Sequence, residues 1–515
     1  MKTHLMFRDR DFDMEEELPP GEPALRQDLE LDVLYSAMAD GDEFMFKVAS
    51  KAVPLGLRAD LETILYRQAV LQDCLKNYPT VKLLYNIALR AIEGKRGLWW
   101  GLSSHSPGST LYGALELLRM QIVLLEELKG LAELHAHEFK SEGFSAFFAM
   151  IKAELPAAYL AEIKTYLKEL EFRKGVLISA RLDKGNEGTD YVLRKSQRPN
   201  PGWLTRLFEH KPAFSFRIAP RDEAGARALS ELHDRGINSV ANALAQSGNH
   251  VEGFFAMLRT ELAFYHGCIN LRQSLEKRNV PVCYPIPTSM DALEHSCVGL
   301  RDACLALMTG EEIVGNDLDA TGKNLAIVTG ANQGGKSTFL RSIGLAQLMM
   351  QCGMFVAAES FRANIRDNLF THYKREEDAT MESGKFDEEL LRMSGVIDKL
   401  TPHAMVLFNE SFAATYEHEG SEIARQIVHA LLQTPAKIFF VTHLYEFARG
   451  MFEERLDKAA FLRAERDPDG GRTFKVKPGE PLQTSFGIDL YNKIFNSPEK
   501  HRKDGNARLA SADGL

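Results

Sequence analysis

The sequence lacks three features that would place it in other classes of protein. No run of apolar residues approaches the ~18 needed for a membrane helix, and the N-terminus has no signal peptide, so we expect a cytoplasmic protein without a membrane partner. The net charge of −9 excludes a uniformly basic coat for nucleic acid but still allows a local basic groove. No C-x-x-C pair occurs, which argues against a zinc site and favours reduced thiols. The six cysteines are scattered: Cys74, Cys268, Cys283, Cys297, Cys304 and Cys352.

The composition is that of a globular protein with more than one core. The 515 residues are 45% hydrophobic and 26% charged, enough apolar material for two to four domains. Shifts in composition predict four parts. They are a flexible acidic leader (1–28), a mostly helical core and lever region (29–315), an α/β domain (316–498) and a polar tail (499–515).

Helical periodicity dominates the first half of the chain. Leu111, Leu115, Leu118, Ile122 and Leu125 recur at three- and four-residue spacing, which predicts one apolar seam along a helix. The turn-rich stretch 94–109 predicts a loop or hinge between two helices. Helical pattern returns at about 224–277, and a Pro-rich extended linker follows.

Residues 174–218 differ from their surroundings. Segments 176–180 and 191–194 read as short strands around a turn. The stretch 194–217 holds six basic residues and one acid, the most basic stretch of an acidic protein. It is either a surface that contacts phosphates or an irregular solvated loop. Possible DNA contacts are Arg194, Lys195, Arg198, Arg206 and Lys211.

The pattern after Gly322 alternates strands and helices, which predicts an α/β domain with a parallel sheet. The apolar strand 324–329 runs into Gly330-Ala-Asn-Gln-Gly-Gly-Lys-Ser-Thr338, a G-x-x-x-x-G-K-[ST] match between a strand and a helix. Glycines let successive N–H groups turn toward phosphate oxygens, and the helix N-terminus adds its dipole. Lys336 is then expected to neutralise the β- and γ-phosphates of ATP, and the Ser337 hydroxyl to bind Mg²⁺.

Two further strands end in polar residues. The strand 404–408 is followed by Asn409 and Glu410, the position of a Walker B acid pair. Glu410 is expected to act as the general base, while Asn409 offers Mg²⁺ an amide oxygen without charge. The strand 437–442 is followed by His443, which is placed to sense the γ-phosphate.

Together these residues resemble the MutS family of DNA mismatch-repair ATPases. The matching stretches follow the order of that family over some 170 residues. They are G-A-N-Q-G-G-K-S-T (330–338), Gly353-Met-Phe-Val-Ala-Ala, Phe370-Thr-His, L-F-N-E-S-F-A-A-T-Y-E-H-E-G (407–420), Val441-Thr-His-Leu-Tyr-Glu-Phe and Ser485-Phe-Gly-Ile-Asp. The upstream region is similar to the helical core and levers of the family, and 174–218 to the part near its DNA clamp.

The resemblance implies a P-loop, ABC-type ATPase domain that dimerises and shares each nucleotide between two subunits. Phosphate and Mg²⁺ would be held by Gly330, Asn332, Gly334, Gly335, Lys336, Ser337 and Thr338. Glu410 and His443 would be catalytic, and Asn409 would join Ser337 at the metal. The stretch 411–415 would reach the nucleotide of the partner through Thr415, although it departs from the G-R-G-T-S-like residues of the family.

The resemblance also has a gap. The family reads mismatches with an N-terminal domain that carries an F-x-E wedge, and only about 30 residues precede the core here. We therefore expect a short member without the mismatch-recognition and connector domains. Its expected function is that of a dimeric, ATP-hydrolysing clamp on mismatched or otherwise unusual DNA.

Two alternatives remain open at this level. The net charge, Asn409 and the missing reader fit an ATP-gated scaffold or regulatory switch that binds proteins without a DNA role. A small-molecule P-loop kinase would need an acceptor pocket and a lid, and it gives no reason for long lever helices.

Overall fold

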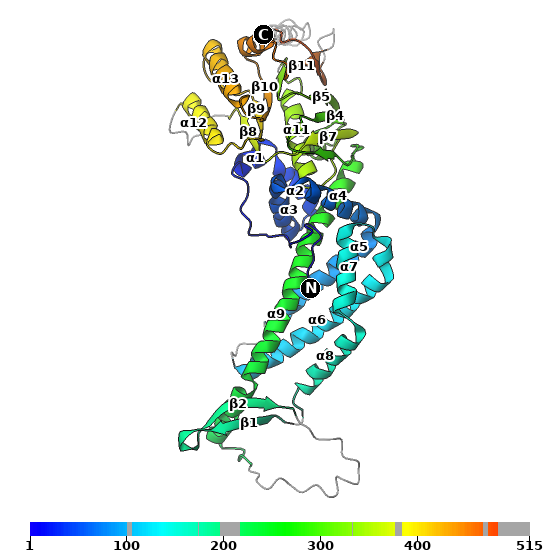
Figure 1. The fold of residues 1–515 in the computed structure, drawn as a ribbon, viewed down its shortest axis with the longest axis vertical. Coiled ribbons are helices and arrows are strands. Elements are labelled where there is room, and N and C mark those ends of the chain that lie inside the picture. Colours follow the sequence, from blue (N-terminus) through cyan, green and yellow to red (C-terminus); the bar gives the residue numbers. More distant parts are fainter. Residues whose placement is uncertain are drawn as a thin grey trace, which may run out of the picture. The chain divides into compact units, whose positions relative to one another are not determined.

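The computed structural model describes residues 1–99, 106–173, 175–195, 217–331, 333–375, 384–466 and 472–482. The chain divides into two compact units, one comprising 1–12 and 72–263, the other 13–71 and 264–515. Two helices, α4 (Leu61–Lys76) and α9 (Glu223–Glu276), contribute to both units. Figure 1 shows the helices and strands of both units with their labels.

The first unit is mainly helical. Besides parts of α4 and α9 it contains α5 (Tyr78–Trp99), α6 (Pro107–His135), α7 (Glu142–Glu154) and α8 (Ala157–Glu169). The predicted seam is confirmed, since all five of its residues are buried on α6. Four of them, Leu111, Leu115, Leu118 and Ile122, pack with residues of α8 and α9 such as Leu167 and Ile237. In the described ranges no single helix is long and apolar enough to cross a membrane; α7 and α8 reach that composition only as a pair bent by 52°.

The loop predicted at 94–109 is much shorter than expected. Helix α5 continues to Trp99 and α6 begins at Pro107, with Ser106 as its N-cap. Gly94 therefore lies inside a helix, where a Cβ would stand 2.1 Å from the sulfur of Met120 on α6. The glycine that suggested a loop serves instead to let two helices approach closely.

The two short strands predicted within residues 174–218 are confirmed. Strands β1 (Leu177–Leu182) and β2 (Gly188–Arg194) form an antiparallel hairpin in which Leu177 pairs with Arg194. Figure 1 shows this hairpin projecting from the helices of its unit. Of the predicted DNA contacts, Arg198, Arg206 and Lys211 lie outside the described residues.

The prediction that residues 1–28 form a solvated leader is wrong. In the first unit Leu5, Met6 and Phe12 are buried, and the carboxylate of Glu261 accepts the backbone N–H groups of Leu5 (2.7 Å) and Phe12 (2.9 Å). In the second unit, residues 22–28 form helix α1. Glu261 lies some 250 positions away from Leu5 and Phe12 in the sequence. The local sequence shows only acidic residues and prolines, which suggested a tail.

The second unit combines helices with two sheets. Its helices are α1 (Glu22–Asp28), α2 (Leu31–Ala39), α3 (Glu43–Leu55), α10 (Ala303–Thr309), α11 (Lys336–Gln351), α12 (Lys385–Ile397), α13 (Glu417–Leu431) and α14 (Tyr445–Glu453). The strands of the larger sheet, in spatial order, are β12 (Arg472–Pro478), β11 (Ala459–Arg466), β6 (Leu325–Thr329), β10 (Lys437–Val441), β9 (Met405–Asn409) and β8 (Leu369–Tyr373). All neighbours are parallel except β11 and β12. The predicted α/β domain with a parallel-sheet core is therefore confirmed.

A smaller sheet was not predicted. It has the order β3 (Ile286–Thr288), β7 (Ser360–Asn364), β4 (His295–Leu300) and β5 (Asn316–Asp319). The Pro-rich stretch expected to be a linker is part of this region, because Cys283 pairs with Val356 and β3 pairs with β7. Proline is compatible with such edge positions, where no ladder N–H is required.

Strands β6, β8, β9 and β10 of the larger sheet are buried on both faces, as their continuous apolar sequences predict. One face, which includes Ile327, Phe408 and Phe440, packs against α12, α13 and α14. The opposite face receives α11, where a Cβ on Gly344 would contact Leu407. Figure 1 shows α12 and α13 on one side of the strands and α11 on the other. With both faces covered, the residues that follow these strands reach the surface at the ends of the strands.

Candidate active site

Three predicted motifs meet at one edge of the larger sheet. Val441, the last residue of β10, is level with Asn409 at the end of β9 on one side and with Val328 of β6 on the other. The carboxyl ends of β6, β9 and β10 are therefore level with one another. Ligands of parallel sheets bind at this edge, because the loops that follow the strands converge there.

The glycine-rich loop between β6 and α11 uses conformations that suit glycine. Gly330 has φ +122°, and a Cβ on it would lie 3.0 Å from both the N and the Cβ of Ala464. Gly335 has φ +87° and is the N-cap of α11. The hairpin β11–β12 packs against this loop, since Phe474 would be 3.5 Å from a Cβ on Gly335. The loop is thus a close-packed backbone turn that opens a 16-residue helix.

Lys336 is folded back over this loop. Its Nζ donates to the carbonyl oxygens of Gly330 and Ala331, both at 2.9 Å. Burial lowers the pKa of Lys336 to about 8, and the nearby Glu410 carboxylate opposes that effect only in part. A buried ammonium in the first turn of α11, where the helix dipole also favours negative charge, is a strong candidate for binding an anion.

The structure brings Ser337 and Asn409 together. Ser337 Oγ donates to Asn409 Oδ1 at 2.9 Å, which joins the first turn of α11 to the end of β9. Both groups are oxygen donors of the kind that Mg²⁺ prefers, and neither carries a charge.

Glu410 and His443 also meet. His443 Nε2 lies 2.6 Å from Glu410 Oε1, so the residues that follow β9 and β10 are hydrogen-bonded across the sheet edge. This hydrogen bond is the main cause that lowers the pKa of Glu410, and the charge of Lys336 adds to it against the effect of burial. The carboxylate is therefore ionised at neutral pH, as a proton acceptor must be.

The remaining predicted phosphate ligands lie in the same loop or just after it. Gly334 is buried, and a Cβ there would stand 3.0 Å from the Ala331 carbonyl oxygen and 3.1 Å from Ala464. Thr338 is half-buried in the first turn of α11. Asn332 lies outside the described residues.

The stretch 411–415 departs in part from its predicted role. Ser411 and Phe412 are completely buried, so they do not face a partner subunit. Phe412 stacks on His372, with ring centroids 5.3 Å apart. Thr415 is half-buried, and its hydroxyl donates to Glu419 in the first turn of α13. Of the stretch, only residues 413–415 are accessible enough to contact another molecule.

Sequence reasoning missed two contributors to this edge. Phe474 and Ala464, which pack on the glycine loop, come from a hairpin that carries no motif. Glu389 on α12 is buried and accepts the N–H of Phe412. Its place on the apolar face, three residues after Phe386 and four before Met393, was a signal for burial that the sequence did offer.

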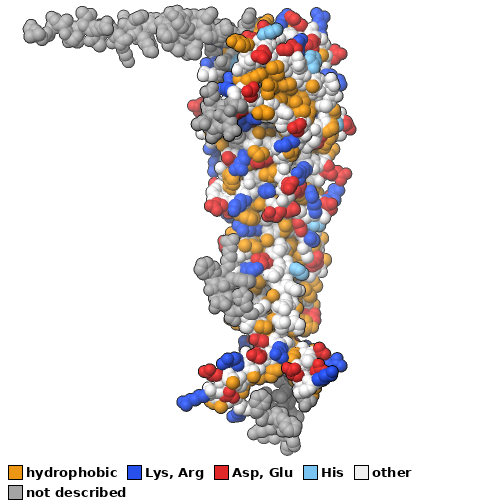
Figure 2. All heavy atoms as spheres, turned by 90° about the vertical axis from the view of Figure 1, so that its left-hand side faces the viewer, with side chains coloured by type: hydrophobic (Ala, Val, Ile, Leu, Met, Phe, Trp, Pro, Cys, Tyr) orange, Lys and Arg blue, Asp and Glu red, His pale blue; other side chains and the backbone are white. Residues whose placement is uncertain are grey.

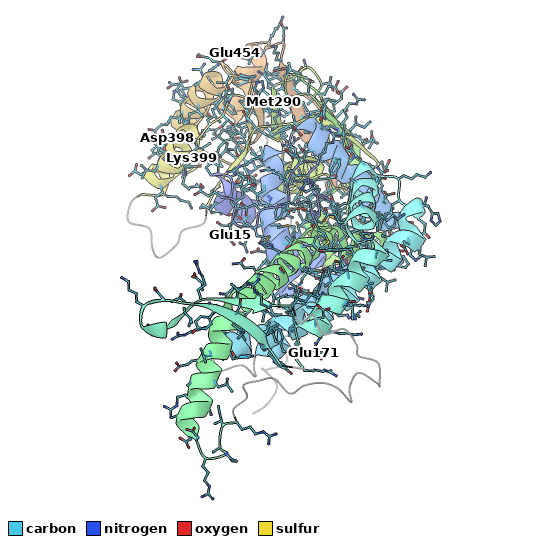
Figure 3. All side chains as sticks on the ribbon, turned by 60° about the horizontal axis from the view of Figure 1, so that its bottom comes forward. Glu15, Glu171, Met290, Asp398, Lys399 and Glu454 are labelled. Carbon is cyan, nitrogen blue, oxygen red and sulfur yellow. The ribbon has the colours of Figure 1, made fainter. Side chains whose placement is uncertain are left out.

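The described residues in and beside the segment 174–218 carry a more balanced charge than the basic stretch 194–217 suggests. Arg194 and Lys195 are exposed, but Lys195 pairs with Glu169 at 3.2 Å and Arg194 donates to Ser179 at 2.9 Å. Glu171, which is labelled in Figure 3, forms ion pairs with Arg119 and Arg173. The lowest part of Figure 2 accordingly shows basic and acidic side chains intermixed around the hairpin.

Two protein-family models match this chain, one in its first half and one in its second half. The family model described as the MutS2 N-terminal domain matches residues 59–278, and the one described as MutS domain V matches residues 326–509. This chain belongs to the MutS family. The first MutS match contains the β1–β2 hairpin, and the second contains every strand end of the candidate site.

Curated MutS relatives match a shorter part. Proteins named DNA mismatch repair protein MutS are 35% identical over 192 residues in Porphyromonas gingivalis, 33% over 208 in Leptospira interrogans and 30% over 212 in Chloroflexus aurantiacus. These matches cover 36%, 38% and 40% of this chain, respectively. The chain spans only 21%, 23% and 22% of the length of these relatives.

Proposed function

We propose that this MutS-family protein binds and hydrolyses ATP at the carboxyl edge of its larger sheet, and that ATP controls its contact with DNA. The observation that supports this most is the convergence of three strand ends. They bring the Lys336 loop, the Ser337–Asn409 pair and the Glu410–His443 pair to one place.

The glycine-rich loop supplies the phosphate site in this proposal. Its amides and the positive end of the α11 dipole favour anionic oxygens. Lys336 would exchange its two bonds to loop carbonyls for bonds to the β- and γ-phosphates, a favourable exchange because ionic hydrogen bonds are stronger than neutral ones.

The donor set fits Mg²⁺, with Ser337 Oγ and Asn409 Oδ1 as the groups that would hold it. When bound, the ion supplies positive charge that stabilises the phosphate oxygens. Because Asn409 is neutral, we infer weaker retention of the ion than an aspartate would give.

The Glu410–His443 pair provides the proton chemistry. Glu410 is ionised and positioned to accept the proton of an attacking water molecule. His443 fixes the orientation of that carboxylate and lies at the same edge, where it would sense the γ-phosphate. Residues 413–415 would contact the nucleotide of a second copy in a homodimer, with Thr415 as the polar group.

The DNA role rests on the relatives named for mismatch repair and on the exposed Arg194 and Lys195, at the end of the hairpin and directly after it. Mixed charge around these residues favours a modest number of phosphate contacts over a continuous basic track.

ATPase measurements with and without a panel of duplex, mismatched and branched DNA test this function. Lys336→Ala should weaken nucleotide binding at least ~100-fold, since it removes the only side-chain cation that the described loop residues supply. Retained affinity would contradict the phosphate assignment. DNA binding at low salt should weaken steeply as salt rises, and Arg194→Ala with Lys195→Ala should reduce that slope by about two. A protein that ignores every DNA at low salt would instead be an ATP-gated switch for protein partners.

A further inference from the structure

The backbone directly after β9 is held in an unusual conformation. Glu410 has φ +56° and Phe412 has φ +63°, so two non-glycine residues flanking Ser411 are left-handed. Such conformations are uncommon for these residue types and persist only where surrounding contacts enforce them. Because Glu410 is the first of the two, the contacts that enforce the turn also set where its carboxylate points.

One of these contacts comes from α12. Glu389 Oε1 accepts the backbone N–H of Phe412 at 2.6 Å, inside the protein. Ser411 adds a second contact, with Oγ 2.8 Å from His372 Nδ1 and 2.5 Å from the His372 carbonyl oxygen. The N–H of Glu410 itself donates to Val441 of β10 at 2.9 Å. The turn is thus tied to α12, β8 and β10 at once.

Burying the carboxylate of Glu389 costs free energy, so its presence at this position indicates that its hydrogen bond to Phe412 has a role. Glu389 is 3% exposed and shares the face of α12 that packs on the sheet core. Burial raises the pKa of Glu389, while the Phe412 N–H and the charges of Arg392, Lys374 and Lys385 oppose that effect. An apolar side chain would pack there at lower cost, but it would leave the Phe412 N–H without an acceptor.

His372 completes the connection between α12 and the turn. Its Nε2 lies 3.0 Å from the carbonyl oxygen of Glu389, and burial lowers its pKa to about 4, so the ring is neutral. Nε2 therefore donates to that carbonyl, and the unprotonated Nδ1 and the His372 carbonyl oxygen both face the single hydroxyl proton of Ser411. The same ring stacks on Phe412, so the Glu389 main chain and side chain are both fixed relative to the turn.

We propose that Glu389 is a positioning residue for Glu410: its carboxylate holds the Phe412 N–H and thereby keeps the Glu410 carboxylate against His443. The inference rests on the proposed ATPase function. It assigns to α12, whose carboxyl end is marked by Asp398 and Lys399 in Figure 3, direct control over the geometry of the proton acceptor.

Three variants of the full-length protein test this role. Glu389→Ala removes the acceptor, Glu389→Gln keeps an acceptor oxygen, and Glu388→Ala is a matched control one residue away. We expect Glu389→Ala to lower kcat for ATP about 10- to 100-fold with nucleotide affinity within about twofold, because only the geometry of Glu410 changes. Glu389→Gln should stay within about threefold of the parent, and Glu388→Ala should match it.

Hydrogen exchange gives a second readout that does not depend on turnover. The Phe412 amide should exchange faster in Glu389→Ala and remain protected in Glu389→Gln and Glu388→Ala. An unchanged kcat in Glu389→Ala, or an equal loss in Glu389→Gln, would refute the positioning role while leaving the ATPase proposal intact. If the parent protein fails to hydrolyse ATP, the proposed function fails and the positioning role in that reaction fails with it. Exchange at Phe412 would then show separately whether Glu389 holds the turn.

Discussion

Lys336 should make nucleotide binding depend on pH in a range where ordinary lysines do not titrate. Burial lowers its pKa from 10.5 to about 8 in the unliganded protein. Anionic phosphates select the ammonium form, and in the complex they stabilise it. As the pH rises through 8, the free protein loses this proton and must regain it to bind, so affinity falls as pH rises.

The size of the effect follows from that pKa. Between pH 7.5 and pH 9 the charged fraction of a group with pKa ~8 falls from about three quarters to about one tenth, which predicts a loss of affinity of roughly eightfold, or ~1.2 kcal/mol. A lysine with the ordinary value of 10.5 would remain almost fully charged over the same range, and affinity would not change. The two cases are therefore easy to distinguish.

Titration calorimetry with a non-hydrolysable ATP analogue at constant ionic strength measures this dependence. Lys336→Arg is the matched control, because a guanidinium stays charged throughout the range. The variant should bind more weakly and without the pH slope. Lys437 at the amino end of β10 is another buried lysine, with a pKa of about 7, and the variant retains it. A pH slope that came from Lys437 would therefore persist in Lys336→Arg. An affinity that is flat from pH 7.5 to 9 in the parent protein, or a slope that persists in Lys336→Arg, would refute the reasoning.

Three further variants test other parts of the site. Glu410→Gln should retain ATP binding but slow turnover at least ~100-fold in a steady-state assay, since it removes the proton acceptor; unchanged turnover would place the base elsewhere. Asn409→Asp should tighten Mg²⁺ roughly tenfold in a metal titration of the nucleotide complex, because it adds a charge beside Ser337. No change would mean that the metal is held without this position. Gly420→Ala should destabilise the protein by ~1–3 kcal/mol in thermal or denaturant unfolding, because its Cβ would stand 2.2 Å from the Phe412 carbonyl oxygen. Gly450→Ala, which meets nothing within 4 Å inside α14, should be neutral or stabilising, and an equal loss there would remove the steric explanation.

The glycine-rich loop shows how far local reasoning reaches. Gly330 and Gly335 are required by their own backbone angles, and the neighbouring lysine follows from the chemistry of phosphate binding. The apolar seam on α6 was equally readable, because helical spacing alone decides which residues share a face. The helical region followed by an α/β domain could likewise be predicted from the order of these patterns.

The N-terminal residues and the smaller sheet show where local reasoning ends. Leu5 and Phe12 are ordered through Glu261, and Cys283 pairs with Val356, so their structure depends on partners far away along the chain. Composition suggested a leader in one case and a linker in the other. No local pattern reports such a partner.

The sequence by itself determined which groups can do chemistry: a glycine turn with Lys336 and Ser337, a carboxylate at Glu410 and an imidazole at His443. Only the tertiary structure decided that they meet, because β6 pairs with β10 and β10 with β9, an order that the chain does not follow. It also decided that Glu389, one acid among several on α12, is the one turned inward to hold the backbone beside Glu410. The physical reason is that side-chain chemistry belongs to each residue, whereas burial and hydrogen-bond partners depend on how distant segments pack.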